Sequence, residues 1–297
     1  AKPTAELLHV NVWVIVIIAG GLMTASAYYG IKAIEIVSFI SVPLIAILGT
    51  YSMVTATADG GGLSAIFAKS TGMGVVSAVG LVVGSFVSGG SATPNFTRFA
   101  KSTSSAVITT VVAFFLGNTL MFSFGAVGGA FTGKDDIFYV MIAQGLAIPA
   151  IVVLGANIWT TNNNALYTTG LGYANITKIP KKPLVLVAGI LGTLAALWLY
   201  DNFVGWLNIL NATLPPVGTV LIVDYFARRR SYSAGIVAFK WVPVLSILAG
   251  ALVGWFVKDL GIPAINAMVT TVAVYLGGMA LEHALGLEFT VGEPQDL

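Results

Sequence analysis

Long apolar stretches, separated by short loops that carry the charges, run along the whole chain. A helix that spans a membrane needs about 20 mostly apolar residues, and nine segments of roughly that length and composition occur. The pattern therefore predicts an all-α polytopic membrane protein. The predicted spans are 8–29, 33–56, 73–97, 103–131, 137–171, 183–200, 202–226, 241–257 and 263–284.

Two of these spans, 183–200 and 202–226, are separated by almost nothing. Helices joined by so short a connection usually become antiparallel neighbours. We therefore expect a tight hairpin around Asp201 and Asn202.

The span 73–97 contains residues that disfavour a continuous helix. Gly89 and Gly90 can adopt conformations that other residues avoid, and Pro94 lacks a backbone N–H and disfavours helix at the residue before it. The stretch GSFVSGGSATPNFTRFA thus predicts a half helix, a break near residues 88–91 and a second short element. An unbroken membrane helix that ends in an ordinary loop is an equally good interpretation of this pattern alone.

Composition supports the membrane class and excludes several functions. Apolar residues make up 57% of the chain and charged residues 9%, whereas soluble domains carry roughly 25% charge. The net charge of +2 indicates no nucleic-acid partner, because the basic residues lie in short loops. The chain has no cysteine, and its two histidines, His9 and His283, lie far apart. We expect no disulfide, no metal cluster and no cofactor.

The distribution of Lys and Arg predicts the orientation in the membrane, since cytoplasmic loops carry an excess of both. Loops on the side reached after the first span hold ten of these residues, and loops on the other side hold four. The first side is therefore expected to be cytoplasmic, and the C-terminus with it. The ten are Lys32, Arg98, Lys101, Lys178, Lys181, Lys182, Arg228, Arg229, Arg230 and Lys240; the four are Lys2, Lys69, Lys134 and Lys258.

This orientation places the start of the chain outside. No cleavable signal peptide is visible, because the first apolar segment lacks a basic leader and a small-residue cleavage site. An odd number of spans with an outside start suggests that an odd number of further spans belongs before Ala1.

Three consecutive asparagines and four threonines interrupt the apolar pattern in the stretch IWTTNNNALYTTG, residues 158–170. A polar group buried in hydrocarbon without a partner costs about 2–7 kcal/mol, so these side chains need a compensating partner. Successive helical residues turn by about 100°, which predicts one polar stripe on this helix and leaves Asn162 and Asn163 pointing elsewhere. Helix–helix packing can explain two or three such residues, but five favour a binding site. The stripe consists of Asn157, Thr160, Thr161, Asn164 and Thr168.

The chemistry of the stripe favours a hard cation and a neutral substrate. Hydroxyl and carbonyl oxygens suit Na⁺ better than nitrogen or sulfur ligands do. A proton-driven carrier usually has an ionisable group within the membrane, whereas Glu35, Asp201 and Asp224 lie near the ends of predicted spans. Sodium is therefore the expected coupling ion.

Several stretches carry a resemblance to a known family. They are VVGSFVSGGSATPNFTRFAK, FFLGNTLMFSFGAVGGA, VMIAQGLAIPAIVVLGANIWTTNNNALYTTGLGYANIT, and LWLYDNFVGWLNIL followed by PPVGTVLIVDYFARRR, which together cover most of 75–230. In these stretches the chain resembles the nucleobase-cation-symport family, and within it the bacterial cytosine permeases.

The resemblance implies a twelve-helix carrier with the LeuT-like inverted-repeat fold, of which this chain would hold about nine spans, beginning at the fourth. The chain would then be a single transmembrane transporter domain, 1–297. Residues 8–56 would end the first repeat, 73–226 would form the second, and 241–284 would be two accessory helices.

The resemblance also implies roles for individual residues. Phe86 would stack on a flat base, although packing would be its expected role without the resemblance. The base's polar edge would meet Ser85, Ser88 and Asn162, whose amide both donates and accepts. The Asn157 carbonyl and the hydroxyls of Thr160 and Thr161 would bind sodium; Asn163 and Asn164 receive no role.

These expectations describe a sodium-coupled cytosine symporter of the bacterial inner membrane that works by alternating access, as a monomer in the lipid bilayer. The alternatives are a sister carrier for another nucleobase, hydantoin or allantoin, and a proton-coupled carrier. A channel is disfavoured because no filter-like loop is visible. An enzyme is disfavoured because paired carboxylates, a nucleophile with a base, and a metal cluster are all missing from the sequence.

Overall fold

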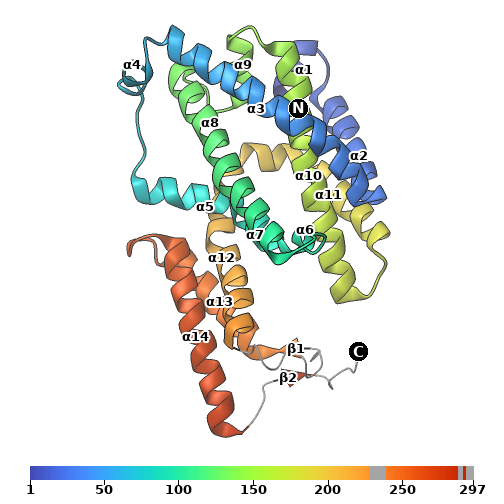
Figure 1. Cartoon of the computed structure of the whole chain (residues 1–297), viewed down its shortest axis with the longest axis vertical. Helices are drawn as coiled ribbons and strands as arrows, with labels where there is room; N and C mark the ends of the chain where they lie inside the picture. Colours follow the sequence, from blue (N-terminus) through green and yellow to red (C-terminus); the bar gives the residue numbers. More distant parts are fainter. Residues whose placement is uncertain (228–238, 287–289, 292–297) are drawn as a thin grey trace. The chain divides into compact units, whose positions relative to one another are not determined.

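The computed structural model describes residues 1–227, 239–286 and 290–291, and these residues are almost entirely helical (Figure 1). The basic run Arg228–Arg230 and the last six residues, which entered the orientation argument, lie outside the described residues. The helices are α1 (Lys2–Leu8), α2 (Val12–Tyr29), α3 (Ile31–Asp59), α4 (Leu63–Phe67), α5 (Val75–Ala92), α6 (Pro94–Thr97), α7 (Thr103–Val111), α8 (Asn118–Thr132), α9 (Ile137–Ala143), α10 (Ala147–Thr177), α11 (Lys181–Asp201), α12 (Phe203–Ala227), α13 (Trp241–Phe256) and α14 (Pro263–Leu285).

Two short features depart from the α-helical pattern. A π-helical segment, Val112–Gly117, joins α7 to α8 without a break. The two-residue strands β1 (Phe239–Lys240) and β2 (Thr290–Val291) pair antiparallel. The all-α membrane class is otherwise confirmed.

Seven of the described helical stretches are long and apolar enough to cross a membrane. Two further expected spans differ from these seven. The 16-residue helix α13 is apolar but shorter, and α10 is long, at 31 residues, but carries the polar segment. The seven are Val12–Tyr29, Ile34–Asp59, Val75–Thr97, Thr103–Thr132, Lys181–Asp201, Phe203–Ala227 and Pro263–Leu285.

The expectation of one span over 137–171 is wrong, because this region forms two helices. Helix α9 ends at Ala143, and Gly145 adopts a positive φ of 76° before α10 begins. Gln144 ties the break to α3: its side-chain oxygen accepts from the Ser52 hydroxyl (2.5 Å) and its nitrogen donates to the Ser52 carbonyl oxygen (3.0 Å). The helix interruption thus lies here, and the side chain of Gln144 bonds it to a neighbouring helix.

The predicted break near residues 88–91 is also wrong, because α5 continues to Ala92. Neither Gly89 nor Gly90 takes a positive φ, since glycine permits an unusual conformation without requiring one. The helix is interrupted at Thr93, and Pro94 begins α6. Proline is tolerated at the first position of a helix, where the missing N–H would have no partner.

The chain divides into two compact units. The first contains Ala1–Thr71 and Thr97–Trp198, and the second contains Gly72–Phe96 and Leu199–Leu297. In the first unit, Phe138 and Met141 of α9 pack with Ala150 and Leu154 of α10. In the second, Val220, Val242 and Tyr275 join α12, α13 and α14. Asn202 alone separates α11 from α12, while the predicted hairpin packing and the repeat boundaries stay predictions.

Helices α2 and α11 meet through a reciprocal pair of glycine–threonine contacts. A Cβ atom built at Gly20 would overlap the Thr193 side chain, and one built at Gly189 would overlap the Thr24 side chain. Each threonine hydroxyl donates to the carbonyl oxygen of the glycine four residues earlier on its own helix, at 2.7 Å in both cases. Both hydroxyls are thereby satisfied in a contact that only glycine leaves room for.

Because of this contact, we expect the stability of the protein to fall when side-chain volume is added at Gly189. Gly189→Ala should lower the free energy of unfolding by about 1–3 kcal/mol, the usual effect of overpacking, because the β-branched Thr24 is stiff at χ1 and cannot turn away. Gly192→Ala on the same helix is the matched control, since no atom lies within 4 Å of its added Cβ. Thermal unfolding of both variants in detergent measures the difference. Equal effects of the two substitutions would contradict the close contact.

Candidate functional site

The polar segment of α10 packs with a face that differs from the predicted stripe. Four residues of this segment are buried, namely Thr160, Asn163, Tyr167 and Gly170. At about 100° per residue they fall within one sector of about 80°. Of the predicted stripe only Thr160 belongs to this buried face. Thr161 is exposed, and Asn157, Asn164 and Thr168 are half-buried.

Asn163, which received no role from the sequence, is the centre of a buried hydrogen-bond network between α2 and α10. Its side chain is fully buried, and its amide lies 2.9 Å from the Ser26 hydroxyl. With the amide oriented to satisfy both of its ends, its nitrogen donates to the Met23 carbonyl oxygen (2.8 Å) and its oxygen accepts from Trp159 Nε1 (3.1 Å). Trp159 Nε1 also lies 2.8 Å from the Ser26 hydroxyl oxygen. The i, i+4 spacing of Trp159 and Asn163 was the available sequence signal for this network.

The three predicted sodium ligands do converge. The hydroxyl of Thr160 donates to the Asn157 carbonyl oxygen at 2.8 Å, and that of Thr161 donates to the same oxygen at 3.1 Å. Each hydroxyl oxygen keeps lone pairs after it donates its proton. Three neutral oxygens therefore gather at one point on α10, a donor set that suits a hard monovalent or divalent cation.

Asn162 lies next to this oxygen cluster but faces another partner. Its side-chain nitrogen is 3.3 Å from Met23 Sδ on α2, and the side chain is exposed. Sulfur is a weak acceptor, so this contact binds the amide only loosely. The amide of Asn162 remains accessible to a polar ligand.

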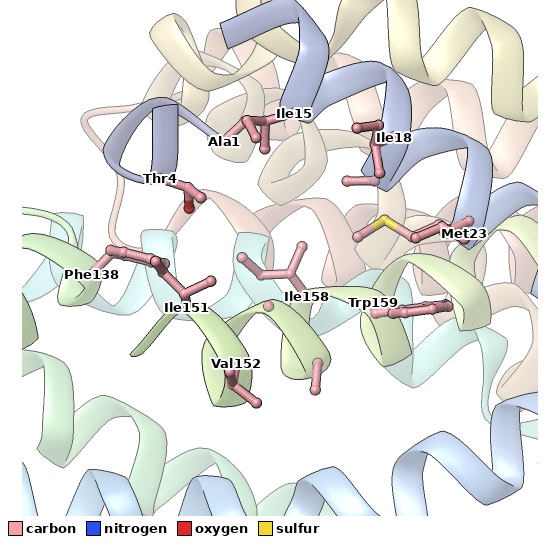
Figure 2. A pocket seen from close by; sticks show the side chains of 14 residues that line it. Ala1, Thr4, Ile15, Ile18, Met23, Phe138, Ile151, Val152, Ile158 and Trp159 are labelled. Atoms are coloured by element: carbon pink, nitrogen blue, oxygen red, sulfur yellow. The ribbon is translucent and has the colours of Figure 1, made fainter. Parts of the chain in front are cut away.

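A cavity of about 390 Å³ lies in the first unit beside this segment, between α1, α2, α9 and α10 (Figure 2). Its lining is predominantly apolar, with Trp159 and Met23 at the end nearest the polar network. Thr4 contributes a hydroxyl. A nucleobase needs several donors and acceptors along its edge, and the cavity offers too few to recognise one.

Near this cavity, a hydrogen bond between a tyrosine and a carboxylate joins α9 to α1. The hydroxyl of Tyr139 on α9 donates to Glu6 on α1 at 2.9 Å. Burial, together with this hydrogen bond and the negative charge of Glu6, raises the pKa of Tyr139 to about 12. The phenol therefore stays protonated near neutral pH and continues to donate to Glu6.

The predicted substrate residues of α5 belong to the second unit and stand on a regular helix. The Ser85 hydroxyl donates to the Val82 carbonyl oxygen (2.7 Å), Phe86 is half-buried, and Ser88 is exposed. On a continuous helix Phe86 and Ser88 point about 160° apart. One small, flat ligand cannot contact both unless α5 unwinds locally. The structure thus brings the three predicted sodium ligands together but does not gather the three α5 residues.

Two buried polar atoms have no hydrogen-bond partner within the described part of the chain, Thr168 Oγ1 on α10 and Asn211 Oδ1 on α12. Asn211 lies against α5, where a Cβ atom built at Gly80 would be 3.0 Å from its side-chain nitrogen. Such unpaired groups are costly. The apolar sequence around Asn211 gave no signal for this contact, because it depends on which helix packs against α12.

Comparison with known proteins gives consistent results. Residues 2–236 match the family described as permeases for cytosine/purines, uracil, thiamine and allantoin. The cytosine permeases of Escherichia coli O157:H7 and of strain K12 are each 46% identical to the chain over 282 residues, which are 93% of this chain and 67% of the relative. The solved inward-facing conformation of Mhp1 superposes with a TM-score of 0.66 at 18% identity, covering 96% of this chain and 69% of the other. This last likeness concerns the fold and confirms the LeuT-like expectation.

Because of this hydrogen-bond network, replacing Asn163 should destabilise the protein more than replacing the neighbouring Asn164. Asn163→Leu should lower the free energy of unfolding by about 1–3 kcal/mol, because Trp159 and Ser26 would lose a buried partner. Asn164→Leu, on the adjacent half-buried position, is the matched control and should have a smaller effect. Thermal unfolding followed by tryptophan fluorescence reports both. A larger effect at Asn164 than at Asn163 would contradict the network.

Proposed function

The chain belongs to the family of permeases for cytosine/purines, uracil, thiamine and allantoin, and from this membership we propose that it carries cytosine across a bacterial inner membrane in symport with sodium. Its relatives are permeases, so the chain is a multi-pass membrane transport protein and not an enzyme. The observation that carries the proposal of cytosine is the 46% identity to two cytosine permeases across 93% of the chain.

The oxygen cluster on α10 supports sodium as the coupled ion. The hydroxyl oxygens of Thr160 and Thr161 lie 2.8 and 3.1 Å from the Asn157 carbonyl oxygen, and all three oxygens are neutral. Rotation of each hydroxyl would turn its proton away and present a lone pair to a cation. Uncharged ligands hold a monovalent ion weakly enough for release, which a transport cycle requires.

Base recognition would depend on one aromatic and three polar side chains. Phe86 would stack on the flat face of cytosine, while Ser85, Ser88 and Asn162 would meet its amino and carbonyl groups. Because Phe86 and Ser88 point about 160° apart on the continuous α5, one base would contact both only if the backbone between these two residues left the α-helical conformation. Alternating access would expose this site to each side of the membrane in turn.

The membrane orientation follows from the basic residues. With ten Lys and Arg on one side and four on the other, that first side and the C-terminus would face the cytoplasm. We propose that the transporter acts as a monomer.

Another nucleobase, hydantoin or allantoin is the alternative substrate, and proton coupling is the alternative to sodium. The surroundings of Asp224 argue against proton coupling through this carboxylate. The Tyr275 hydroxyl donates to the Asp224 carboxylate, a contact that joins α14 to α12 within the second unit. Asp224 is the fourth residue from the end of its helix, so this carboxylate takes part in helix packing and is less suited to a mid-membrane proton relay.

Sodium dependence provides the central test. Thr160→Ala and Thr161→Ala should each weaken the stimulation of cytosine binding by sodium more than cytosine binding at zero sodium. Asn162→Ala should reduce cytosine binding at every sodium concentration. Linkage makes the coupling reciprocal, and it is typically worth about 1–3 kcal/mol. The measurement is a cytosine titration of the protein as it is expressed in the cell, at several sodium concentrations, with potassium keeping the ionic strength constant.

The outcomes separate the parts of this proposal. If the wild-type protein binds cytosine equally well in sodium and potassium, sodium is not the coupled ion. If both threonine variants keep the wild-type sodium dependence, the ion site lies elsewhere. If labelled cytosine neither binds nor exchanges in a counterflow assay, the substrate is one of the alternative compounds.

Phe86 provides a second test. Phe86→Ala should weaken cytosine binding by about 1–3 kcal/mol, the usual value for base–aromatic stacking, and Phe86→Trp should retain most of the affinity because its ring also offers a π-face. Isothermal titration with cytosine measures both variants. Unchanged affinity in a folded Phe86→Ala protein would assign the residue to packing.

A further inference from the structure

Positive side chains converge on one buried tyrosine at an end of the first unit. Tyr167 of α10 is 5% exposed. The Arg98 guanidinium donates to its hydroxyl oxygen at 3.1 Å, and Lys181 Nζ lies 4.4 Å from the centre of its ring. Two cations from separate segments therefore share one aromatic residue.

A third cation and a helix junction complete the cluster. Lys182 Nζ lies 5.0 Å from the centre of the Tyr28 ring on α2. Lys181 Nζ is 3.7 Å from the position of a Cβ atom at Gly30, between α2 and α3. At Gly170 an added Cβ would lie 2.9 Å from Lys181 Cγ, so the absence of a side chain there allows Lys181 to lie close against α10.

The contacts that hold these cations do not neutralise them. The rings of Tyr167 and Tyr28, and that of Phe99 at 4.7 Å from the Arg98 guanidinium carbon, attract a cation without carrying a negative charge. Within the described ranges no carboxylate forms a salt bridge with Arg98, Lys181 or Lys182.

The surrounding sequence and the helix dipole both add positive potential. The segments 29–35, 97–103 and 171–183 together contain six basic residues and one acidic residue, Glu35. Lys181 and Lys182 also open α11, and cations are unfavourable at the N-terminal end of a helix, which is the positive end of its dipole. Such an arrangement is stabilised when an external anion enters it.

We propose that Arg98, Lys181 and Lys182 form a binding site for a phosphate group. A guanidinium pairs with phosphate oxygens through two parallel N–H donors, and ammonium groups add mobile point charges. The cluster lies where α10 ends and α11 begins. Because α11 is long and apolar enough to cross a membrane, its first residues would lie at the depth of the lipid headgroups. The phosphate of an anionic phospholipid headgroup is therefore the proposed ligand. Basic pockets between membrane helices bind such headgroups. This site is independent of the cytosine and sodium residues.

The test uses two triple variants with the same change in net charge. The site variant is Arg98→Gln, Lys181→Gln and Lys182→Gln. The matched control is Lys69→Gln, Lys134→Gln and Lys258→Gln, which removes three positive charges from other loops. Each purified, delipidated protein is titrated with phosphatidylglycerol, with phosphatidylcholine and with inorganic phosphate, and binding is followed by native mass spectrometry and by the shift in Tm.

The wild-type protein and the control variant should bind phosphatidylglycerol equally well, and the site variant at least tenfold more weakly. If inorganic phosphate competes and raises the Tm of the wild type and of the control variant but not that of the site variant, the site takes a soluble phosphate; if it has no effect, the site takes the lipid headgroup. Equal affinity of the site variant and the wild type, or equal losses in both triple variants, would overturn the proposal. If the site variant does not fold, Lys182→Gln at the exposed position should still weaken phosphatidylglycerol binding about threefold, and no change there would overturn it as well.

Discussion

Lipid tails are as apolar as leucine, so the helices of this chain gain little from burying leucine and must associate by approaching closely. Glycine makes the close approach possible in both units. Gly20 and Gly189 accept a threonine from the facing helix in the first unit, and in the second unit Gly84 lies directly against the Leu207 carbonyl of α12. The remaining contacts depend on this proximity, because dispersion forces act only at short range.

The same environment explains how the polar residues are arranged. Most of the hydroxyls within helices donate to a carbonyl three or four residues earlier, as Ser246 and Thr271 do, which removes the cost of placing them in hydrocarbon. Side chains with amide groups cannot be satisfied so locally. Gln144 therefore bonds to α3 and Asn163 to α2, and these two amides fix where α10 begins and how it is rotated.

Apolar length was enough to predict most of the spans, and the resemblance was enough to predict the fold. The division of 137–171 into two helices was not predictable from hydropathy, since the break depends on a positive φ at Gly145 and on a partner, Ser52, that is 92 residues away. For the site, the convergence of Thr160 and Thr161 on Asn157 is local helix geometry and was predictable. The burial of Asn163 was not, because the packed face of α10 is chosen by α2.

The π-helical segment Val112–Gly117 has a consequence for how the chain can change in length. A π-turn accommodates one more residue than an α-turn while the helix on either side keeps its own phase. Deleting one residue here would convert the turn to α-helix and leave the buried face of α8, which contains Phe124 and Val127, directed as before. The same deletion inside α8 would rotate every later side chain of that helix by about 100°. This segment is therefore a place where the chain can lose one residue without altering either packing surface.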